Sequence, residues 1–254
     1  MKIRNPKSRF DIRIKKGDFV LDVGGGSNPH PRANVVVDKF PLDNTHRCGD
    51  LRVFKNQKFI KADGEDLPFK DNEFDYVISC HVLEHVENPA KFLDELSRVG
   101  RRGYLETPSL IGEYLIPKKS HRWVILELDK KLVLMRKADV GLPSSIEFGD
   151  LFQKYVAPNS IEFRLFMKAY PDLFTVRYEW IDKIDYVINP KDSRLRSFFT
   201  SSWDEEKILT ILKGVKKKSR FEQVISFMSI FTGMSFDFIK SILYRKGRRV
   251  IPKE

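Results

Sequence analysis

The sequence predicts an α/β fold: a doubly wound, mostly parallel seven-stranded sheet with a shortened first crossover and a C-terminal helical appendage. Short apolar runs alternate with helical or turn-like segments through the first 110 residues. Runs of this kind are typical of strands that are buried on both faces of a parallel sheet. Because crossovers separate them, we expect helices on the faces of the sheet. The five predicted strands cover residues 19–23, 34–38, 58–63, 74–80 and 102–108.

The first crossover is unusually short. The glycines Gly24–Gly26 follow the first strand, and Pro29 and Pro31 stand where the first turns of a helix would be. Only ten residues separate Val23 from Asn34, whereas a crossover with its helix needs at least about 10 to 12. We therefore predict a loop that contains a single helical turn or no helix.

One helix is clearly signalled between the fourth and fifth strands. Asn88 is a suitable N-cap, Pro89 fits the first helical position, and Gly100 stands where a C′ glycine belongs. The apolar residues between them share one helical face. They are Phe92, Leu93, Leu96 and Val99.

Beyond the fifth strand the pattern is weaker. Residues 122–137 predict a hairpin that turns at residues 129–130, and residues 173–190 predict the last two strands of the sheet. Residues 138–172 are irregular with helical patches, which we interpret as a lid or a substrate-facing insertion. We assign residues 1–190 to the sheet domain and 191–254 to a basic, amphipathic extension, helical over 203–218 and 221–245.

Composition excludes several classes of protein. Cys48 and Cys80 give neither a disulfide framework nor a repeated metal-ligand spacing, so a reducing compartment is expected. The N-terminus is basic without an apolar stretch, unlike a secretory signal. No apolar run approaches the roughly 18 residues of a membrane span. Of the net charge of +11, most lies in residues 213–254, with 11 Lys and Arg against 3 Asp and Glu.

The polar groups of interest follow the predicted strands. Glycines 24 and 26 follow the first strand, Asp38 ends the second, Asp63 ends the third and His81 follows the fourth. Ligands bind outside the carboxyl ends of strands in such sheets. A nicotinamide-binding loop is the rival interpretation. It is disfavoured because position 29 is proline and Asp38 lies only 14 residues after Gly24, not about 20.

These stretches resemble one family. The segments VLDVGGG, VVVDKFP, ADGEDLPFKDNEFDYVISCHVLEHVENPAKFLDELSRV and LETPS are similar to class I S-adenosylmethionine-dependent methyltransferases of the type 11 group. The similarity covers about residues 17–110 and implies a Rossmann-like sheet with S-adenosylmethionine as cofactor. Asn28 replaces the last glycine of the usual loop.

The resemblance also implies roles for individual residues. Asp22, Gly24 and Gly26 would lie close to the amino-acid part of the cofactor, and Asp38 would bind its ribose. Asp63, with Gly64 and Glu65 beside it, would bind the adenine. His81 would lie near the sulfonium. These carried-over cofactor residues are Asp22, Gly24, Gly26, Asp38, Asp63, Gly64, Glu65 and His81.

Catalytic residues are less evident. Histidine suits a general base near neutral pH, and His121 follows the fifth strand, in the region that usually faces the acceptor; a surface histidine is the alternative. Glu106 is a second candidate, for positioning. His81 and His85 have i, i+4 spacing, but with no third ligand apparent we expect no metal.

The acceptor is not encoded in the motifs. We expect O-methylation of a small-molecule, glycan or lipid-linked acceptor; a nucleic-acid (RNA) methyltransferase and a non-catalytic membrane or partner adaptor are the alternatives. Residues 213–249 combine apolar residues with basic flanks. They fit an anionic membrane surface, a helix packed on the domain or, less well, nucleic acid. The expected location is cytoplasmic, with peripheral attachment to the inner face of the membrane if residues 213–249 bind lipid.

Overall fold

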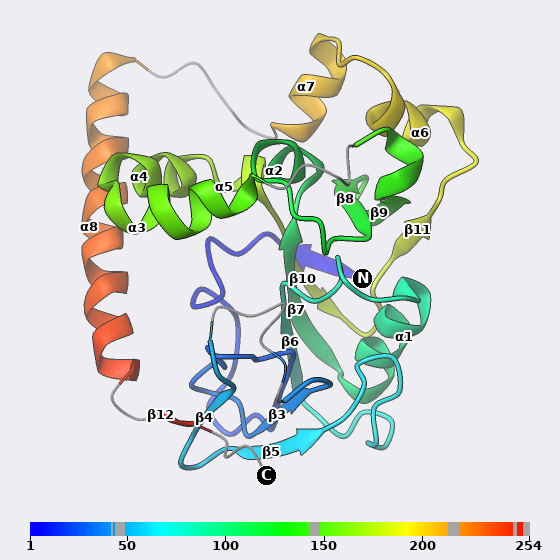
Figure 1. The fold of residues 1–254 in the computed structure, drawn as a ribbon, viewed down its shortest axis with the longest axis vertical. Helices are drawn as coiled ribbons and strands as arrows, with labels where there is room; N and C mark the ends of the chain where they lie inside the picture. The colour runs from blue at the N-terminus through cyan, green and yellow to red at the C-terminus, as the bar shows by residue number, and fades with distance from the viewer. Residues whose placement is uncertain (42, 44–48, 143–147, 213–218, 246–247, 251–254) are drawn as a thin grey trace.

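The computed structural model describes the chain except residues 42, 44–48, 143–147, 213–218, 246–247 and 251–254, and residues 237–245 by backbone alone (Figure 1). Cys48 therefore lies outside the described residues, while Cys80 is a free thiol.

A seven-stranded sheet forms the centre of the molecule, in the order β1-β10-β7-β6-β2-β3-β5. Its five strands from β7 to β5 are parallel, β10 is antiparallel to β7, and β1 is antiparallel to β10. The mostly parallel seven-stranded sheet is thus confirmed. The strands are β1 (Lys2–Arg4), β2 (Val20–Val23), β3 (Val35–Asp38), β5 (Lys58–Lys61), β6 (Tyr76–Cys80), β7 (Arg102–Pro108) and β10 (Thr175–Ile181).

The prediction that residues 173–190 supply the last two strands was wrong for the second of them. The seventh strand is β1, at the start of the chain, and it pairs with β10. Strand β11 (Tyr186–Ile188) instead joins the hairpin β8 (Trp123–Leu128) and β9 (Lys131–Arg136) in a separate sheet. That hairpin turns as predicted at Asp129 and Lys130, which both have positive φ angles, 50° and 63°.

The first crossover has no helix. Between β2 and β3 the chain forms turns, with Gly24 and Gly26 at φ angles of 74° and 54°. The buried side chain of Gln57 donates hydrogen bonds to the carbonyls of His30 and Ala33, at 2.7 and 3.0 Å. The loop is therefore held in place by hydrogen bonds from Gln57, which lies between β3 and β5 in the sequence.

Helix α1 (Pro89–Val99) begins as predicted, with the Asn88 side chain accepting from Lys91 N. Its end differs from the prediction. Gly100 has φ −123° and ψ 139°, an extended rather than a left-handed conformation. Glycine is needed there because a Cβ would overlap the side chain of Val77 on β6.

The two faces of the sheet are covered differently. One core joins the sheet to the apolar face of α1 and to the β8–β9 hairpin. The core on the other face contains Val20, Val36, Tyr76 and Ile78 with Ala33 of the loop and Val53 of β4 (Arg52–Phe54). The partly buried Ile12 and Ile14 pack against it. Non-helical segments of the described chain thus take the place of the helices expected on that face.

Residues after the hairpin form short helices. These are η1 (Lys137–Val140), the π-helix η2 (Leu151–Val156), α3 (Ala157–Asn159), α4 (Ile161–Ala169) and α5 (Pro171–Phe174). Helix α2 (Leu110–Leu115) packs on α5. The extension contains α6 (Ser193–Thr200) and α7 (Glu205–Ile211). Phe198 and Phe199 of α6 enter a third core with the hairpin.

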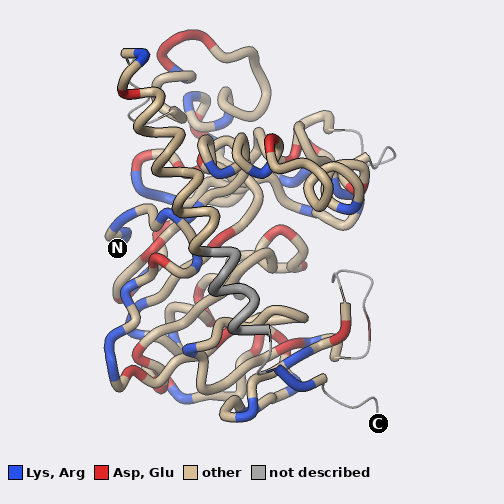
Figure 2. Tube along the Cα trace, turned by 90° about the vertical axis from the view of Figure 1, so that its left-hand side faces the viewer, with Lys and Arg blue, Asp and Glu red and all other residues tan. Residues whose placement is uncertain are grey.

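Helix α8 (Arg220–Arg245) packs along α4 at the side of the molecule (Figures 1 and 2). Strand β12 (Arg248–Val250) follows it and pairs with β4, a contact that the sequence did not suggest. Within the described residues, no helix combines the length and the apolar character that crossing a bilayer requires.

Candidate active site

The carboxyl ends of the parallel strands bring most of the sequence-predicted residues to one edge of the sheet. Gly24 follows β2, Asp38 ends β3, His81 follows β6 and Glu106 lies near the end of β7. Asp63 follows β5 by two residues. This edge is where ligands bind in sheets of this type.

The glycine loop packs against the turn after β6. Gly24 N donates to Val37 O at 2.7 Å. A side chain at Gly24 would overlap Val82 Cγ2. A Cβ at Gly25 would stand 2.9 Å from Val36 Cγ1. The glycines therefore serve close packing of the backbone as well as the turn itself.

Asp22 is an internal anchor of this loop. Its carboxylate is 2% exposed and accepts from His30 N at 2.6 Å. Arg9 of the N-terminal segment is 3.9 Å away. Burial raises the pKa of Asp22 despite these partners. The structure thus gives Asp22 a role in closing the shortened crossover.

Two carboxylates flank the site beyond β3 and β5. Asp38 Oδ1 accepts from Phe40 N at 2.9 Å. Asp63 Oδ1 accepts from Glu65 N at 3.0 Å, and its Oδ2 pairs with Lys39 Nζ at 2.6 Å. Partial burial opposes ionisation of Asp63, but Lys39 and the backbone outweigh it and lower its pKa.

Gly64 and Glu65 have clear structural partners. A Cβ at Gly64 would stand 2.5 Å from Phe92 Cε2 of α1. Glu65 Oε1 accepts from the backbone of Glu87 at 2.8 Å and of Asn88 at 3.1 Å. Both residues fix the start of α1 against the segment after β5, and their role in cofactor binding stays a prediction.

His81 stands between two carboxylates. It has a φ of 57°, and its ring nitrogens lie 3.5 Å from Glu84 Oε1 and 3.4 Å from Glu106 Oε1. Desolvation opposes its charged form, but contacts with Glu106 and Glu84 outweigh it and raise the pKa of His81 to about 10. The ring, half exposed, is therefore a cation at neutral pH.

Glu106 borders a cavity of about 250 Å³ at this edge. Arg9 and Arg177 also border it, and each has a buried Nε with no hydrogen-bond partner among the described residues. The cavity is lined by Lys7, Ser8, Arg9, Phe10, Glu106, Pro171, Thr175 and Arg177. A larger cavity of about 500 Å³ lies at the opposite edge, where β6 and β7 begin, and is remote from these groups.

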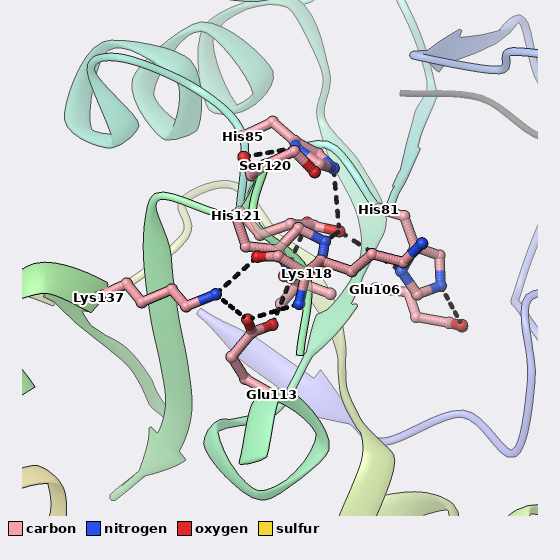
Figure 3. A network of polar contacts seen from close by, with 10 residues as sticks. His81, His85, Glu106, Glu113, Lys118, Ser120, His121 and Lys137 are labelled. Carbon is pink, nitrogen blue, oxygen red and sulfur yellow. Dashed lines mark hydrogen bonds and ion pairs between the residues drawn. The ribbon is translucent and has the colours of Figure 1, made fainter. Parts of the chain in front are cut away.

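His121 lies in a buried polar network (Figure 3). Its Nδ1 contacts Glu113 Oε2 on α2 at 2.5 Å. Lys137 Nζ donates to Glu113 Oε1 at 2.5 Å and to Lys118 O at 2.6 Å. His121 is not among the residues that line the cavity beside Glu106. Its role as a base stays a prediction.

The sequence-based analysis missed this network. Glu113, Lys118 and Lys137 lie on α2, on the loop after it and on η1, so no motif spacing connects them. The signal in the sequence that could have indicated this network is a group of charged residues flanked by apolar residues. These charged residues lie in the segment GEYLIPKKSHR and at position 137.

Comparisons with known proteins find methyltransferases among the proteins that this chain resembles. Residues 41–105 match a family model described as a methyltransferase domain. An uncharacterised protein of Methanocaldococcus jannaschii is 44% identical over 105 residues, 39% of this chain and 50% of that protein. A ubiquinone/menaquinone biosynthesis C-methyltransferase of Rickettsia typhi is 46% identical over 107 residues, 39% of this chain and 42% of that protein. The chain thus spans about half or less of the length of these relatives.

One solved structure aligns over more of the chain. The putative methyltransferase in a complex with the Trm112 activator of Haloferax volcanii is 17% identical, covering 66% of this chain and 83% of that one, with a TM-score of 0.38.

Proposed function

The chain carries a class I methyltransferase domain of the type 11 family, and from this premise we propose that it transfers a methyl group from S-adenosylmethionine to a small-molecule, glycan or lipid-linked acceptor. We propose an oxygen as the acceptor atom. The relative from Rickettsia typhi is named a C-methyltransferase, so carbon is the competing acceptor atom.

The observation that carries the proposal is the set of carboxylates around the glycine loop. Asp38 ends the strand beside β2 and can accept from both ribose hydroxyls. Asp63, beyond the next strand, can accept from the adenine amino group when Lys39 swings aside. Gly24, which adds no side chain of its own, follows the neighbouring strand β2. These groups fit a nucleoside that carries no phosphate.

When bound, the cofactor supplies a methyl group on a sulfonium, which an acceptor attacks in line. The chain's contribution is placement and exclusion of water. Glu106 faces the acceptor cavity and can orient a hydroxyl, while His81 holds the Glu106 carboxylate ionised. Burial opposes that ionisation, but contact with His81 outweighs it and lowers the pKa of Glu106.

The cavity beside Glu106 supports an acceptor with an anionic group. Arg9 and Arg177 each leave a buried Nε–H without a partner, which is costly unless a ligand accepts from it. Guanidinium groups suit phosphate and carboxylate geometry. A phosphate-linked glycan or lipid intermediate has this chemistry.

Calorimetric titration with S-adenosylmethionine tests the cofactor site. We expect micromolar binding by the intact chain and a loss of about 10- to 100-fold in Asp38→Ala, because a hydrogen-bonded carboxylate contributes about 1.5–3 kcal/mol. Asp71→Ala is the matched control, since Asp71 pairs with Arg98 at the protein surface. Absence of binding by the intact chain would reject the enzyme and favour the adaptor.

We also propose that α8 binds an anionic membrane surface. Half-buried residues such as Ile230 and Met234 mark the side against α4, and large apolar side chains are exposed elsewhere. The sequence has no charged residue between positions 223 and 236, whereas both flanks are basic. An apolar face with basic ends fits an interface that contains anionic lipid. The exposed side chains are Phe221, Val224, Ile225, Phe227, Met228, Phe231 and Phe236.

Flotation with vesicles tests this second proposal. The chain should float with vesicles containing phosphatidylglycerol and not with pure phosphatidylcholine, and Phe227→Ser/Phe231→Ser should lose flotation. Equal flotation of the intact chain and the double variant, or equal flotation with the two vesicle types, would reject the proposal. Binding to RNA instead would favour a nucleic-acid acceptor.

A further inference from the structure

Three ligand-type side chains converge beneath the candidate active site. Glu84 and His85 lie in the turn after β6, and His121 lies in the segment before β8. Glu84 Oε1 is 3.9 Å from His85 Nε2 and 4.0 Å from His121 Nε2. Figure 3 shows the two histidines close to each other. One ligand atom from each side chain lies within 4.8 Å of the other two.

The other ring nitrogen of each histidine is already engaged. His85 Nδ1 lies 3.1 Å from the carbonyl oxygen of Ser120, and His121 Nδ1 lies 2.5 Å from Glu113 Oε2. Carbonyl and carboxylate oxygens only accept, so both Nδ1 atoms carry the proton. Nε2 is the ring position of each histidine nearest Glu84, and it can coordinate a cation in the neutral tautomer that has its proton on Nδ1. A histidine oriented by a carboxylate or carbonyl in this way is typical of metal ligands.

Glu84 itself is incompletely satisfied. Its Oε2 accepts from Thr107 Oγ1 at 3.0 Å, while its Oε1, among the residues that the structure describes, is buried without a hydrogen-bond partner. The separations of 3.9 and 4.0 Å to the imidazoles are too long for hydrogen bonds. The charged ring of His81 lies 3.5 Å from this oxygen and offsets part of its charge, but a buried oxygen without a hydrogen bond remains costly.

We propose that Glu84, His85 and His121 bind one divalent cation of the zinc class. Bonds of about 2.0–2.2 Å place tetrahedral ligand atoms about 3.3–3.6 Å apart. Side-chain rotations would complete the site by closing the two gaps from Glu84 by a few tenths of an ångström and the separation of the two histidine nitrogens, which lies within 4.8 Å, by up to about 1.5 Å. Two imidazoles and one carboxylate suit zinc and its neighbours, whereas magnesium and calcium prefer oxygen ligands.

The ion would connect two segments that are distant in sequence. It would tie the turn after β6, which contains His81, to residues 118–122. His81 Nδ1, 3.5 Å from the same Glu84 oxygen, is the nearest further nitrogen given for this oxygen. The site is thus placed to stabilise the floor of the methyl-transfer edge. Its existence does not depend on the proposed function, because the cation can be titrated without S-adenosylmethionine.

Titration of the chelator-treated full chain with zinc chloride tests the proposal. We expect one equivalent to bind, and His85→Gln and His121→Gln each to weaken binding at least about 100-fold. Glu113→Gln, which removes the carboxylate that orients His121, should weaken it about 10-fold. His30→Asn is the control, since it removes another buried histidine and should retain the affinity.

A second measurement uses only the unaltered chain, so it does not depend on whether variants fold. Anomalous diffraction across the zinc edge, from crystals grown with zinc, should place a peak between Glu84, His85 and His121. Three results would each overturn the proposal: retained zinc affinity in folded His85→Gln and His121→Gln, absence of zinc binding by the intact chain, or an anomalous peak only at another position.

Discussion

The side chain of Val82 fills the position that a Cβ on Gly24 would take, so any side chain on the glycine would overlap a methyl group of the valine. Gly24 also has a φ of 74°, which disfavours any side chain. The loop after β2 and the turn after β6 are therefore packed directly against each other at these two residues. Both border the proposed cofactor site, so the glycine there is required by packing as well as by the turn.

We expect Gly24→Ala to lower the free energy of unfolding by about 2–4 kcal/mol, because left-handed strain and overpacking add. Gly141→Ala is the matched control, with a φ of 69° and nothing within 4 Å of the new Cβ, and it should cost only about 1 kcal/mol. Val82→Ala in the Gly24→Ala background should recover most of the difference. Urea unfolding of the four proteins checks this, and equal costs for the two glycines would contradict it.

The central strands could be predicted from the sequence because burial on both faces makes them mostly apolar. Strands β2, β3 and β6 are such runs. Strand β1 has no such pattern, since its three residues KIR form an exposed edge whose place depends on pairing with distant β10. Pairing of β4 with β12 likewise depends on contacts nearly 200 residues apart.

The candidate site, like the sheet, could be predicted only where its residues belong to a local sequence pattern. Asp38 and Asp63 are visible because they follow predicted strands. The i, i+4 spacing of His81 and His85 suggested a helical face, but His81 has a positive φ and the segment forms turns, so the rings are not paired by a helix. Instead, His85 meets His121, with ring centroids 4.7 Å apart, through a tertiary contact that no local pattern encodes.

Lys137 should be sensitive to substitution. Its ammonium group is buried and donates to Glu113 and to the carbonyl of Lys118. Lys137→Met would leave the Glu113 carboxylate without this cation, and we expect a loss of about 3–5 kcal/mol in unfolding free energy. Lys154→Met removes an exposed ion pair with Asp150 and should change stability by no more than about 0.5 kcal/mol. Similar urea midpoints for the two variants would contradict the expectation.

Glu179 should determine whether the N-terminal segment stays attached. The carboxylate is fully buried and accepts from Arg4 Nε, Arg13 N and Tyr76 OH, at 2.7, 2.8 and 2.6 Å. Glu179→Met leaves all three donors unpaired, so we expect a loss of about 3 kcal/mol or more. Hydrogen exchange in residues 2–14 should rise more than in β6 or β7. A uniform rise across the sheet would show that Glu179 does not act on this segment specifically.

The buried ring of His30 should make the protein sensitive to acid. Arg32 N donates to its Nδ1 at 3.2 Å, so the ring is held neutral. Burial, then the charges of Arg9 and Arg32, lower the pKa of His30 to about 3. The ordinary pKa of histidine is about 6.5. Between pH 6.5 and pH 3 the unfolded chain therefore binds a proton at His30 that the folded chain does not bind. The stability contributed by neutral His30 is therefore complete above about pH 6.5 and decreases as the pH falls toward 3. Between pH 7 and pH 5 this one residue should lower the free energy of unfolding by about 2 kcal/mol.

The variant His30→Asn keeps an acceptor near the Nδ1 position and removes the titration. Urea unfolding at both pH values should therefore show that the variant loses about 2 kcal/mol less stability at the lower pH. Parallel pH profiles for the two proteins would show that His30 is protonated without cost in the folded state.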